Sequence, residues 1–229
     1  MAIRALVFDF DGLIVDTETS SFESWREIFI EHGCELTYDV WVDCIGRPGG
    51  YFDAPAHLAR LTGLSLDPKQ LRARRDARFH EMNLGLPMRP GVEAYLLDAR
   101  RLGLKIGIAS SASGARVRRH LDHLGVLNHF HVLKCLEDTT AHKPDPTPYR
   151  AVVEALGVAP AEAIAFEDAP HGVASAKGAG LFCVAVPNRV TQRLDFSQAD
   201  VRVDSLDSLP LEDLLSRFGL SPAVLDTEI

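Results

Sequence analysis

The sequence lacks a long, uncharged hydrophobic run near its start. The longest early run, Ala5 to Phe8, is followed at once by Asp9 and Asp11. A membrane span needs about 20 consecutive apolar residues, and a signal peptide needs an uninterrupted apolar core, so neither can be drawn here. We therefore expect a cytoplasmic protein with no membrane partner.

Blocks of basic residues are also missing. The 229 residues include 24 Lys and Arg against 32 Asp and Glu, which gives a formal net charge of −8. That charge repels a phosphate backbone and an anionic membrane surface, so we expect no nucleic-acid partner. Small phosphorylated substrates are still compatible with the composition, because one local cluster of cations can oppose the overall field.

Signatures of several other sites are absent. The four cysteines are scattered without CxxC spacing, which favours reduced thiols over a disulfide or a thiolate metal site. The stretch from Gly103 to Gly107 lacks the dinucleotide fingerprint, so a nicotinamide cofactor is not supported. Two histidine pairs, His120 with His123 and His129 with His131, have no clear third ligand, so surface or structural histidines are favoured over zinc.

What the sequence does contain is a regular alternation of short apolar runs with amphipathic stretches of helical length. The apolar runs of strand length are Ile3 to Phe8, Leu104 to Ala109, His131 to Cys135, Ala163 to Phe166 and Leu181 to Val186. Between them, apolar residues recur at helical spacing, as expected for crossover helices. The pattern predicts an α/β fold with a buried, mostly parallel sheet.

The segment 17–87 breaks this alternation and is predicted to be helical throughout. Turn chemistry marks both of its ends, at Asp16-Thr17 and at Arg89-Pro90-Gly91. We therefore expect a core domain made of residues 1–16 and 88–229, with residues 17–87 inserted as a helical cap domain. Two linkers between the domains suggest a hinge.

Two carboxylates follow the first predicted strand. Asp9 and Asp11 would leave the carboxyl edge of the sheet together, which is the edge where open α/β sheets bind ligands. A functional interpretation makes Asp9 a nucleophile and Asp11 a general acid and base. The alternative makes both of them turn and cap residues, a common use of Asp before a glycine such as Gly12.

Three later features coincide with the ends or connections of other predicted strands. Ser110 follows the second strand, Lys143 precedes Pro144 in a loop that leads to a helix, and Glu167 with Asp168 follows a third strand. Taken singly, each has an ordinary explanation as a cap or surface residue. Their joint placement indicates a single site.

These motifs together resemble the haloacid dehalogenase-like superfamily. The order is DxDGxxxDT from Asp9, a hydroxyl after the second strand, Lys143-Pro144, and Glu167-Asp168 before a Gly/Ala-rich helix. Arg89-Pro90-Gly91-Val92 and the segment from Glu167 to Gly172 further resemble the helical-cap branch of β-phosphoglucomutase-like and phosphoglycolate-phosphatase-like proteins. The resemblance implies a Rossmann-like three-layer α/β/α core with an inserted α-helical cap.

A metal ion belongs to this hypothesis for reasons of charge. Four carboxylates converging on a dianionic phosphate repel one another, so the site requires a hard cation with oxygen ligands, and Mg²⁺ is the natural candidate. The family pattern implies that Asp9 and Asp168 ligate it directly. It also implies that Asp11 helps through its backbone carbonyl, and that Glu167 acts directly or through water.

The expected activity is a phosphatase reaction through an aspartyl-phosphate on Asp9. Asp11 would protonate the leaving alkoxide and later deprotonate water, Lys143 would add positive charge, and Ser110 would bind phosphoryl oxygens. The resemblance also implies that Thr17 holds Asp11. A carboxylate at Asp11 disfavours carbon–halogen chemistry, because the founding dehalogenases lack an acid there.

Substrate choice is expected to belong to the cap. A weaker sequence signal marks a few residues as candidates for hinge or substrate contacts. They are Gly12, Thr17, Ser111, Gly46 and Arg47. Mutase-like relatives usually carry a His where this chain has Ser21, so hydrolysis of a small phosphorylated metabolite, in particular a sugar phosphate, is favoured over a β-phosphoglucomutase-like reaction. A catalytically idle regulatory protein on the same fold is the third hypothesis. A monomer is the default expectation.

Overall fold

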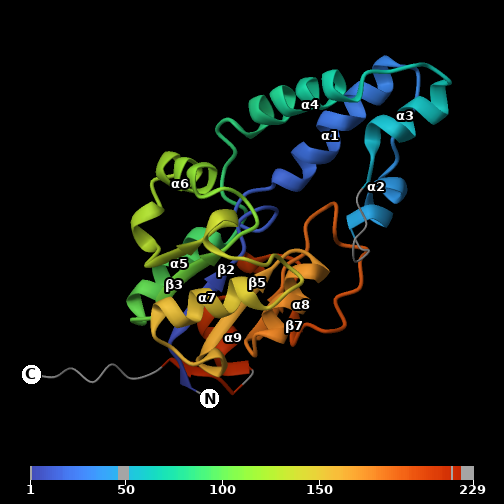
Figure 1. Ribbon diagram of the computed structural model, residues 1–229. Helices are drawn as coiled ribbons and strands as arrows, with labels where there is room; N and C mark the ends of the chain where they lie inside the picture. The colour runs from blue at the N-terminus through green and yellow to red at the C-terminus, as the bar shows by residue number, and fades with distance from the viewer. Residues whose placement is uncertain (1, 46–51, 218, 223–229) are drawn as a thin grey trace, which may run out of the picture.

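The computed structural model describes residues 2–45, 52–217 and 219–222 of the chain, and its centre is a six-stranded sheet (Figure 1). The strand order is β4-β3-β2-β5-β6-β7, and every neighbouring pair is parallel. The strands are β2 (Ala5–Phe8), β3 (Lys105–Ala109), β4 (Val132–Lys134), β5 (Ala163–Glu167), β6 (Phe182–Ala185) and β7 (Val201–Arg202). The predicted α/β fold with a parallel sheet is confirmed.

Helices cover both faces of this sheet. Ala5 and Val7 of β2 pack into a hydrophobic cluster with residues of α7 and α8, whereas Leu6 and Phe8 pack into a second cluster with residues of α5, α6 and α9. The side chains of a strand alternate between faces, so one short apolar run fills both clusters. The helices are α5 (Val92–Arg101), α6 (Gly114–His123), α7 (Thr147–Leu156), α8 (Pro170–Gly178) and α9 (Leu211–Arg217).

Some short elements differ from the prediction. The single strand expected from Ile3 to Phe8 is divided, because β1 (Ala2–Ile3) pairs with β8 (Ser221–Pro222) in a separate sheet. β7 was not predicted, since a two-residue strand is too short to show a periodic pattern. The 3₁₀ helices are η1 (Leu127–His129), η2 (Leu136–Asp138), η3 (Pro160–Glu162) and η4 (Leu206–Ser208).

In the described part of the chain between β2 and α5, four helices project from the sheet (Figure 1). They have a hydrophobic cluster of their own, which includes Phe22, Trp25, Ile28 and Phe29 of the first helix and Leu71 of the last. None of the described helices is both long and apolar enough to cross a membrane. The four helices are α1 (Thr17–Glu31), α2 (Tyr38–Ile45), α3 (Ala54–Thr62) and α4 (Pro68–Asn83).

The two segments that connect α1–α4 to the sheet run side by side. Val15 forms an antiparallel bridge with Met88, and the backbone N–H of Arg89 donates to the carbonyl of Ile14 at 2.8 Å. Immediately beyond, the carboxylate of Asp16 accepts a hydrogen bond from the N–H of Thr19 at 3.1 Å and caps α1. The chain therefore leaves the sheet and returns to it at one place.

Candidate active site

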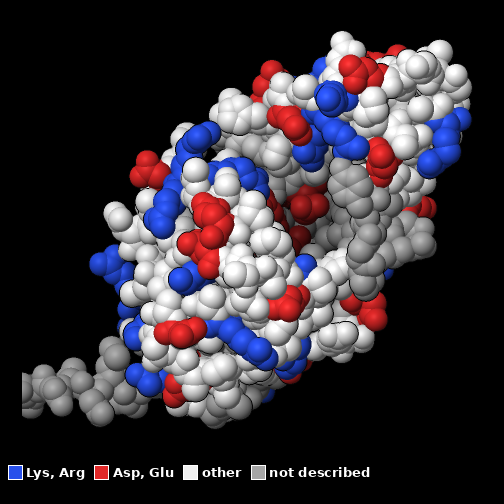
Figure 2. Space-filling view, viewed as in Figure 1, with Lys and Arg blue, Asp and Glu red and all other residues white. Residues whose placement is uncertain are grey.

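The candidate residues gather at the carboxyl edge of the sheet. Asp9 follows β2, Ser110 follows β3, and Asp168 follows β5, while Glu167 is the last residue of β5. These strands are parallel neighbours, so their carboxyl ends meet at one edge. Figure 2 shows acidic side chains inside a hollow of the surface, between the region of the sheet and the projecting helices.

Three of the acids form a tight, buried group. Asp9, Glu167 and Asp168 are 6%, 1% and 3% exposed, and each offers an oxygen within 4.8 Å of the others. Burial raises the pKa of Asp9 to about 8; the ammonium of Lys143 works against this rise, and Glu167 adds to it. Burial, with the charges of Asp9 and Glu167 next, also raises the pKa of Asp168 well above its usual range. The protein alone therefore does not balance the charge of this group.

Lys143 supplies the positive charge nearest to these acids. Its Nζ donates to Oδ1 of Asp9 and, at 2.6 Å, to Oε1 of Glu167. Burial opposes the charge on the ammonium, yet the two carboxylates raise the pKa of Lys143 above its ordinary value. Three ionised carboxylates against one ammonium leave two negative charges, which one divalent cation would balance.

The acidic group fits a magnesium ion by its donor chemistry. Its ligand atoms are all carboxylate oxygens, and within the described residues no group of His, Cys, Asp or Glu other than Asp9, Glu167 and Asp168 comes close enough together to hold an ion. Hard cations such as Mg²⁺ prefer such oxygen ligands over nitrogen or sulfur. The side chain of Asp11 lies outside the group, so its predicted contribution as a ligand is limited to its backbone carbonyl.

Neutral side chains that the sequence did not single out hold these carboxylates. The hydroxyl of Tyr149 donates to Oε1 of Glu167 at 2.6 Å. The amide of Asn188 donates to Oδ2 of Asp168 at 2.7 Å and to the carbonyl of Gly12 at 3.3 Å. Tyr149 belongs to an apolar helical stripe and Asn188 to an irregular loop, so neither carries a local signal of its role.

Asp11 is held through both carboxylate oxygens. The hydroxyl of the buried Thr17 donates to Oδ1 at 2.7 Å, and Nη2 of Arg116 donates to Oδ2. The contact with Thr17 lies where the resemblance places it. Arg116 was missed, because it lies on α6 among other basic residues and looks like part of a solvated helix face.

The remaining candidates differ in their surroundings. Ser110 is buried, and its Oγ accepts a hydrogen bond from the N–H of Ala112 at 3.0 Å. Ser111 is exposed. Gly12 has a φ of +79°, and a Cβ there would lie 2.1 Å from Oδ2 of Asp168, so only glycine fits this close approach. Gly46 and Arg47 lie outside the described residues.

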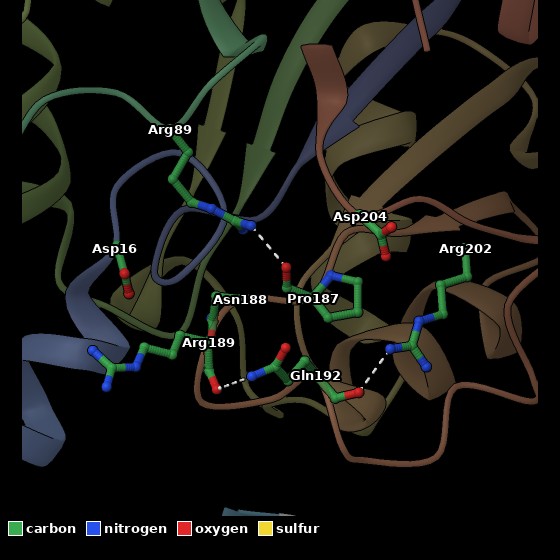
Figure 3. A pocket seen from close by; sticks show the side chains of 8 residues that line it. All are labelled: Asp16, Arg89, Pro187, Asn188, Arg189, Gln192, Arg202 and Asp204. Atoms are coloured by element: carbon green, nitrogen blue, oxygen red, sulfur yellow. Dashed lines mark hydrogen bonds between the residues drawn. The ribbon is translucent and has the colours of Figure 1, made fainter. Parts of the chain in front are cut away.

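A pocket of about 320 Å³ adjoins this site (Figure 3). Arg89, on the returning linker, donates to the carbonyls of Pro187 at 2.8 Å, Val186 at 3.1 Å and Gly12. It thereby ties the loop after β2 to the segment after β6. The pocket is lined by Asp16, Arg89, Pro187, Asn188, Arg189, Gln192, Arg202 and Asp204.

Comparison with known proteins gives a consistent picture. The model of the family described as haloacid dehalogenase-like hydrolase matches residues 6–186. The chain is 44% identical over 217 residues to the Bacillus subtilis (strain 168) protein named "Putative phosphatase YhcW", covering 95% of this chain and 98% of that one. It is 31% identical over 183 residues to validoxylamine A 7'-phosphate phosphatase of Streptomyces hygroscopicus subsp. limoneus, covering 80% and 85% of the two chains.

Solved structures resemble the fold over nearly its whole length. A variant of CbbY from Rhodobacter sphaeroides in complex with xylulose-(1,5)bisphosphate superimposes with a TM-score of 0.72 at 25% identity, covering 93% of this chain and 99% of that chain. The matched range of the family model includes every candidate from Asp9 to Asp168.

Proposed function

Because this chain belongs to the haloacid dehalogenase-like hydrolase family and is a phosphatase, we propose that it hydrolyses phosphoric monoesters of small metabolites, in particular sugar phosphates, with Mg²⁺ as cofactor. We further propose that Asp9 is transiently phosphorylated. The observation that carries the proposal is the buried group of Asp9, Glu167 and Asp168, with Lys143 bonded to two of its members.

Asp9, Glu167 and Asp168 would hold the magnesium ion, together with the backbone carbonyl of Asp11. When bound, the ion neutralises charge on the phosphoryl group and on the acids around it. Lys143 keeps Asp9 and Glu167 in place and adds a fixed positive charge next to them. Ser110 and the neighbouring backbone N–H groups bind phosphoryl oxygens.

In the first half-reaction, a carboxylate oxygen of Asp9 attacks phosphorus as the bond from phosphorus to the ester oxygen breaks. Asp11 gives its proton to the leaving alkoxide. In the second half-reaction, Asp11 takes a proton from water, which attacks phosphorus and releases inorganic phosphate from Asp9. Thr17 orients Asp11 for both transfers through its hydrogen bond to Oδ1.

We propose that residues 17–87 act as a cap domain over a core of residues 1–16 and 88–229. This division is supported by the separate hydrophobic cluster of α1–α4 and by the paired linkers at Val15 and Met88. The core groups handle only the phosphoryl group, so substrate choice falls to residues of the cap.

Hydrolysis is preferred over phosphosugar isomerisation because the relatives at 44% and 31% identity both carry phosphatase names. A mutase has to keep water away from its phosphoenzyme until a sugar phosphate accepts the group. Product analysis separates the two reactions: we expect inorganic phosphate to appear in step with substrate loss, without a bisphosphate activator. An isomeric product that requires such an activator would support the mutase instead.

A panel of phosphorylated sugars and other small metabolites, assayed for phosphate release, tests the proposed function. We expect release from some members of the panel with Mg²⁺ and none after complete chelation. Activity that survives chelation would contradict the metal assignment. No release from any ester would support the idle-protein alternative.

A further inference from the structure

Arg116 lies where the core meets the projecting helices. It belongs to α6, and its Cζ is 5.8 Å from the ring centre of Phe10 in the core and 6.0 Å from that of Phe79 on α4. Its side chain is 29% exposed to solvent. The guanidinium that holds Asp11 therefore lies between Phe10 of the core and Phe79 of α4 and is partly exposed.

A second arginine approaches the same ring from α4. Arg75 lies one turn before Phe79, with its Cζ 4.5 Å from the ring centre. Nη2 of Arg75 donates to the hydroxyl of Ser21 at 2.5 Å, and Nη1 is 3.2 Å from a carboxylate oxygen of the exposed Asp76. Two guanidinium groups thus lie within 6.0 Å of the centre of one aromatic ring, and one of them holds Asp11.

Each of these arginines keeps one buried nitrogen that has no acceptor among the residues that the structure describes. The atoms are Nη1 of Arg116 and Nε of Arg75. Buried guanidinium nitrogens normally find partners, because an unmade hydrogen bond there is costly. The acceptors that suit a pair of guanidinium groups are carboxylates and phosphates, which they bind through charge-assisted bonds.

A further acid near these two arginines is Glu18. It is partly buried, and the positive charges of Arg75 and Arg116 act to lower its pKa. Burial and the neighbouring Asp11 and Asp16 nevertheless raise the pKa of Glu18 to about 7. Glu18 is thus a weak counter-ion near neutral pH, and the two arginines retain capacity for another anion.

The position of Asp11 relates these arginines to the substrate. Asp11 is the proposed proton donor to the leaving oxygen, so the rest of the leaving group lies against its neighbours. We propose that Arg116 and Arg75 bind a second acidic group, a carboxylate or a phosphate, carried by the leaving-group half of the substrate. This inference rests on the proposed function and specifies its substrate class.

The same geometry gives the acidic group a role in turnover. Oδ2 of Asp11 accepts from Arg116, and Oδ1 accepts from Thr17, so Arg116 competes with the leaving group for Oδ2. A substrate anion that takes over the guanidinium of Arg116 releases Oδ2. A neutral leaving group leaves Arg116 on Asp11 and is turned over slowly.

The test compares phosphate monoesters matched in length whose leaving groups carry no acid, a carboxylate or a second phosphate. We expect the wild-type enzyme to have a higher kcat/KM for one of the acidic esters than for the neutral one. Arg116→Gln and Arg75→Gln should each lower the acidic-to-neutral ratio of kcat/KM by about tenfold or more, and Arg116→Lys should recover part of it. The ester whose ratio falls most identifies which acid is bound.

Arg119→Gln is the matched control, because Arg119 lies on the same helix and is exposed. It should keep the wild-type ratio. Equal losses for acidic and neutral esters in Arg116→Gln, or a wild-type enzyme indifferent to the acid, would overturn the proposal. A folding defect affects all esters alike, so the ratio distinguishes it from a lost subsite.

Failure of the proposed function would be visible separately. If the wild type releases phosphate from no ester, calorimetry measures how wild type and Arg116→Gln bind the alcohols that hydrolysis of the two acidic esters would release. These are the hydroxy acid and the alcohol that still carries the second phosphate. Binding of either compound that weakens tenfold or more in the variant supports the subsite without phosphatase activity. If the wild type binds neither compound, the proposed subsite is overturned.

Discussion

The side-chain amide of Asn188 donates to Oδ2 of Asp168 at 2.7 Å, and its carbonyl oxygen accepts from the N–H groups of Val190 and Thr191. Val190 in turn packs into the hydrophobic cluster of α1–α4. One amide therefore connects a proposed metal ligand with the loop that contacts the inserted helices.

We predict that Asn188→Ala weakens magnesium binding. Without the amide, Asp168 loses its hydrogen-bonded partner, and losses of supporting contacts of this kind typically reduce metal affinity about 10- to 100-fold. The measurement is the Mg²⁺ concentration that half-saturates thermal stabilisation of the protein, which needs no substrate. Gln192→Ala changes an exposed amide of the same loop and should leave that concentration unchanged. Equal Mg²⁺ dependence of both variants would contradict the role of Asn188.

Gly172 is predicted to be indispensable for the position of Glu167. A Cβ at Gly172 would lie 1.9 Å from Cδ of Glu167, so Gly172→Ala has to displace the carboxylate. We expect the free energy of unfolding to fall by about 1–3 kcal/mol and phosphatase activity to fall more than about tenfold. Urea unfolding and phosphate release measure the two effects.

Gly178, at the end of the same helix, provides the control. A Cβ there would lie 3.4 Å from the nearest atom, Cβ of Pro146, which is an ordinary contact. Gly178→Ala should therefore keep both stability and activity. If both alanine variants behave alike, crowding against Glu167 is not the reason why glycine is needed at position 172.

Glu18 should make stability depend on pH. The pKa of Glu18 is raised from 4.5 to about 7 by burial, with Asp11 and Asp16 adding to the rise. The folded protein thus binds this proton more tightly than the unfolded chain does, so stability declines as pH rises from about 4.5 to 7, and the loss is complete above about 7. At pH 8 we expect the free energy of unfolding of Glu18→Gln to exceed that of wild type. Because Glu18 retains some exposed surface, the expected difference is only about 1–2 kcal/mol.

The measurement is urea unfolding at pH 5, 6, 7 and 8 in the presence of a chelator. The stability difference between Glu18→Gln and wild type should grow across this series. Glu35→Gln, at an exposed position in the same insertion, should show a constant difference. A constant difference for Glu18→Gln as well would refute the assigned cause.

Arg89 should stabilise the junction between the linker and the core. Its guanidinium donates to three backbone carbonyls, those of Gly12, Val186 and Pro187. Removing it takes this donor from the carbonyls of Val186 and Pro187 and leaves the carbonyl of Gly12 with only the amide of Asn188, so Arg89→Ala should lower the free energy of unfolding by about 2–4 kcal/mol. Arg202→Ala, which removes an exposed arginine bonded to the carbonyl of Gln192, should cost less than about 1 kcal/mol. Similar losses of unfolding free energy in the two variants would contradict the stabilising role of Arg89 at this junction.

The sequence predicted the elements whose signals are local. The apolar runs that became β2, β3, β5 and β6 are buried on both faces, so their composition alone identified them. The same holds for the placement of Asp9 and Asp168, which follow from the ends of adjacent parallel strands. The sequence and the strand order together therefore bring the acidic residues to one edge.

The supporting contacts could not be predicted because they join distant parts of the chain. Asn188 is 20 residues from Asp168, and Arg116 is 105 residues from Asp11. Tyr149 has the spacing of a core residue, and that spacing gives no sign of the hydrogen bond that its hydroxyl donates to Glu167. Side-chain direction across the sheet edge decides these contacts, and no local pattern encodes it.

Phosphorylation of Asp9 is the central claim, and one measurement tests it most directly. Wild type and Asp9→Asn are mixed with Mg²⁺ and a turned-over ester and quenched in acid, and the protein is analysed by mass spectrometry for added phosphate. We expect a phosphate on the peptide containing Asp9 in wild type, none in Asp9→Asn, and a drop in kcat of at least about 10³-fold in the variant. Turnover close to wild type in Asp9→Asn, with deamidation back to Asp excluded, would contradict the account.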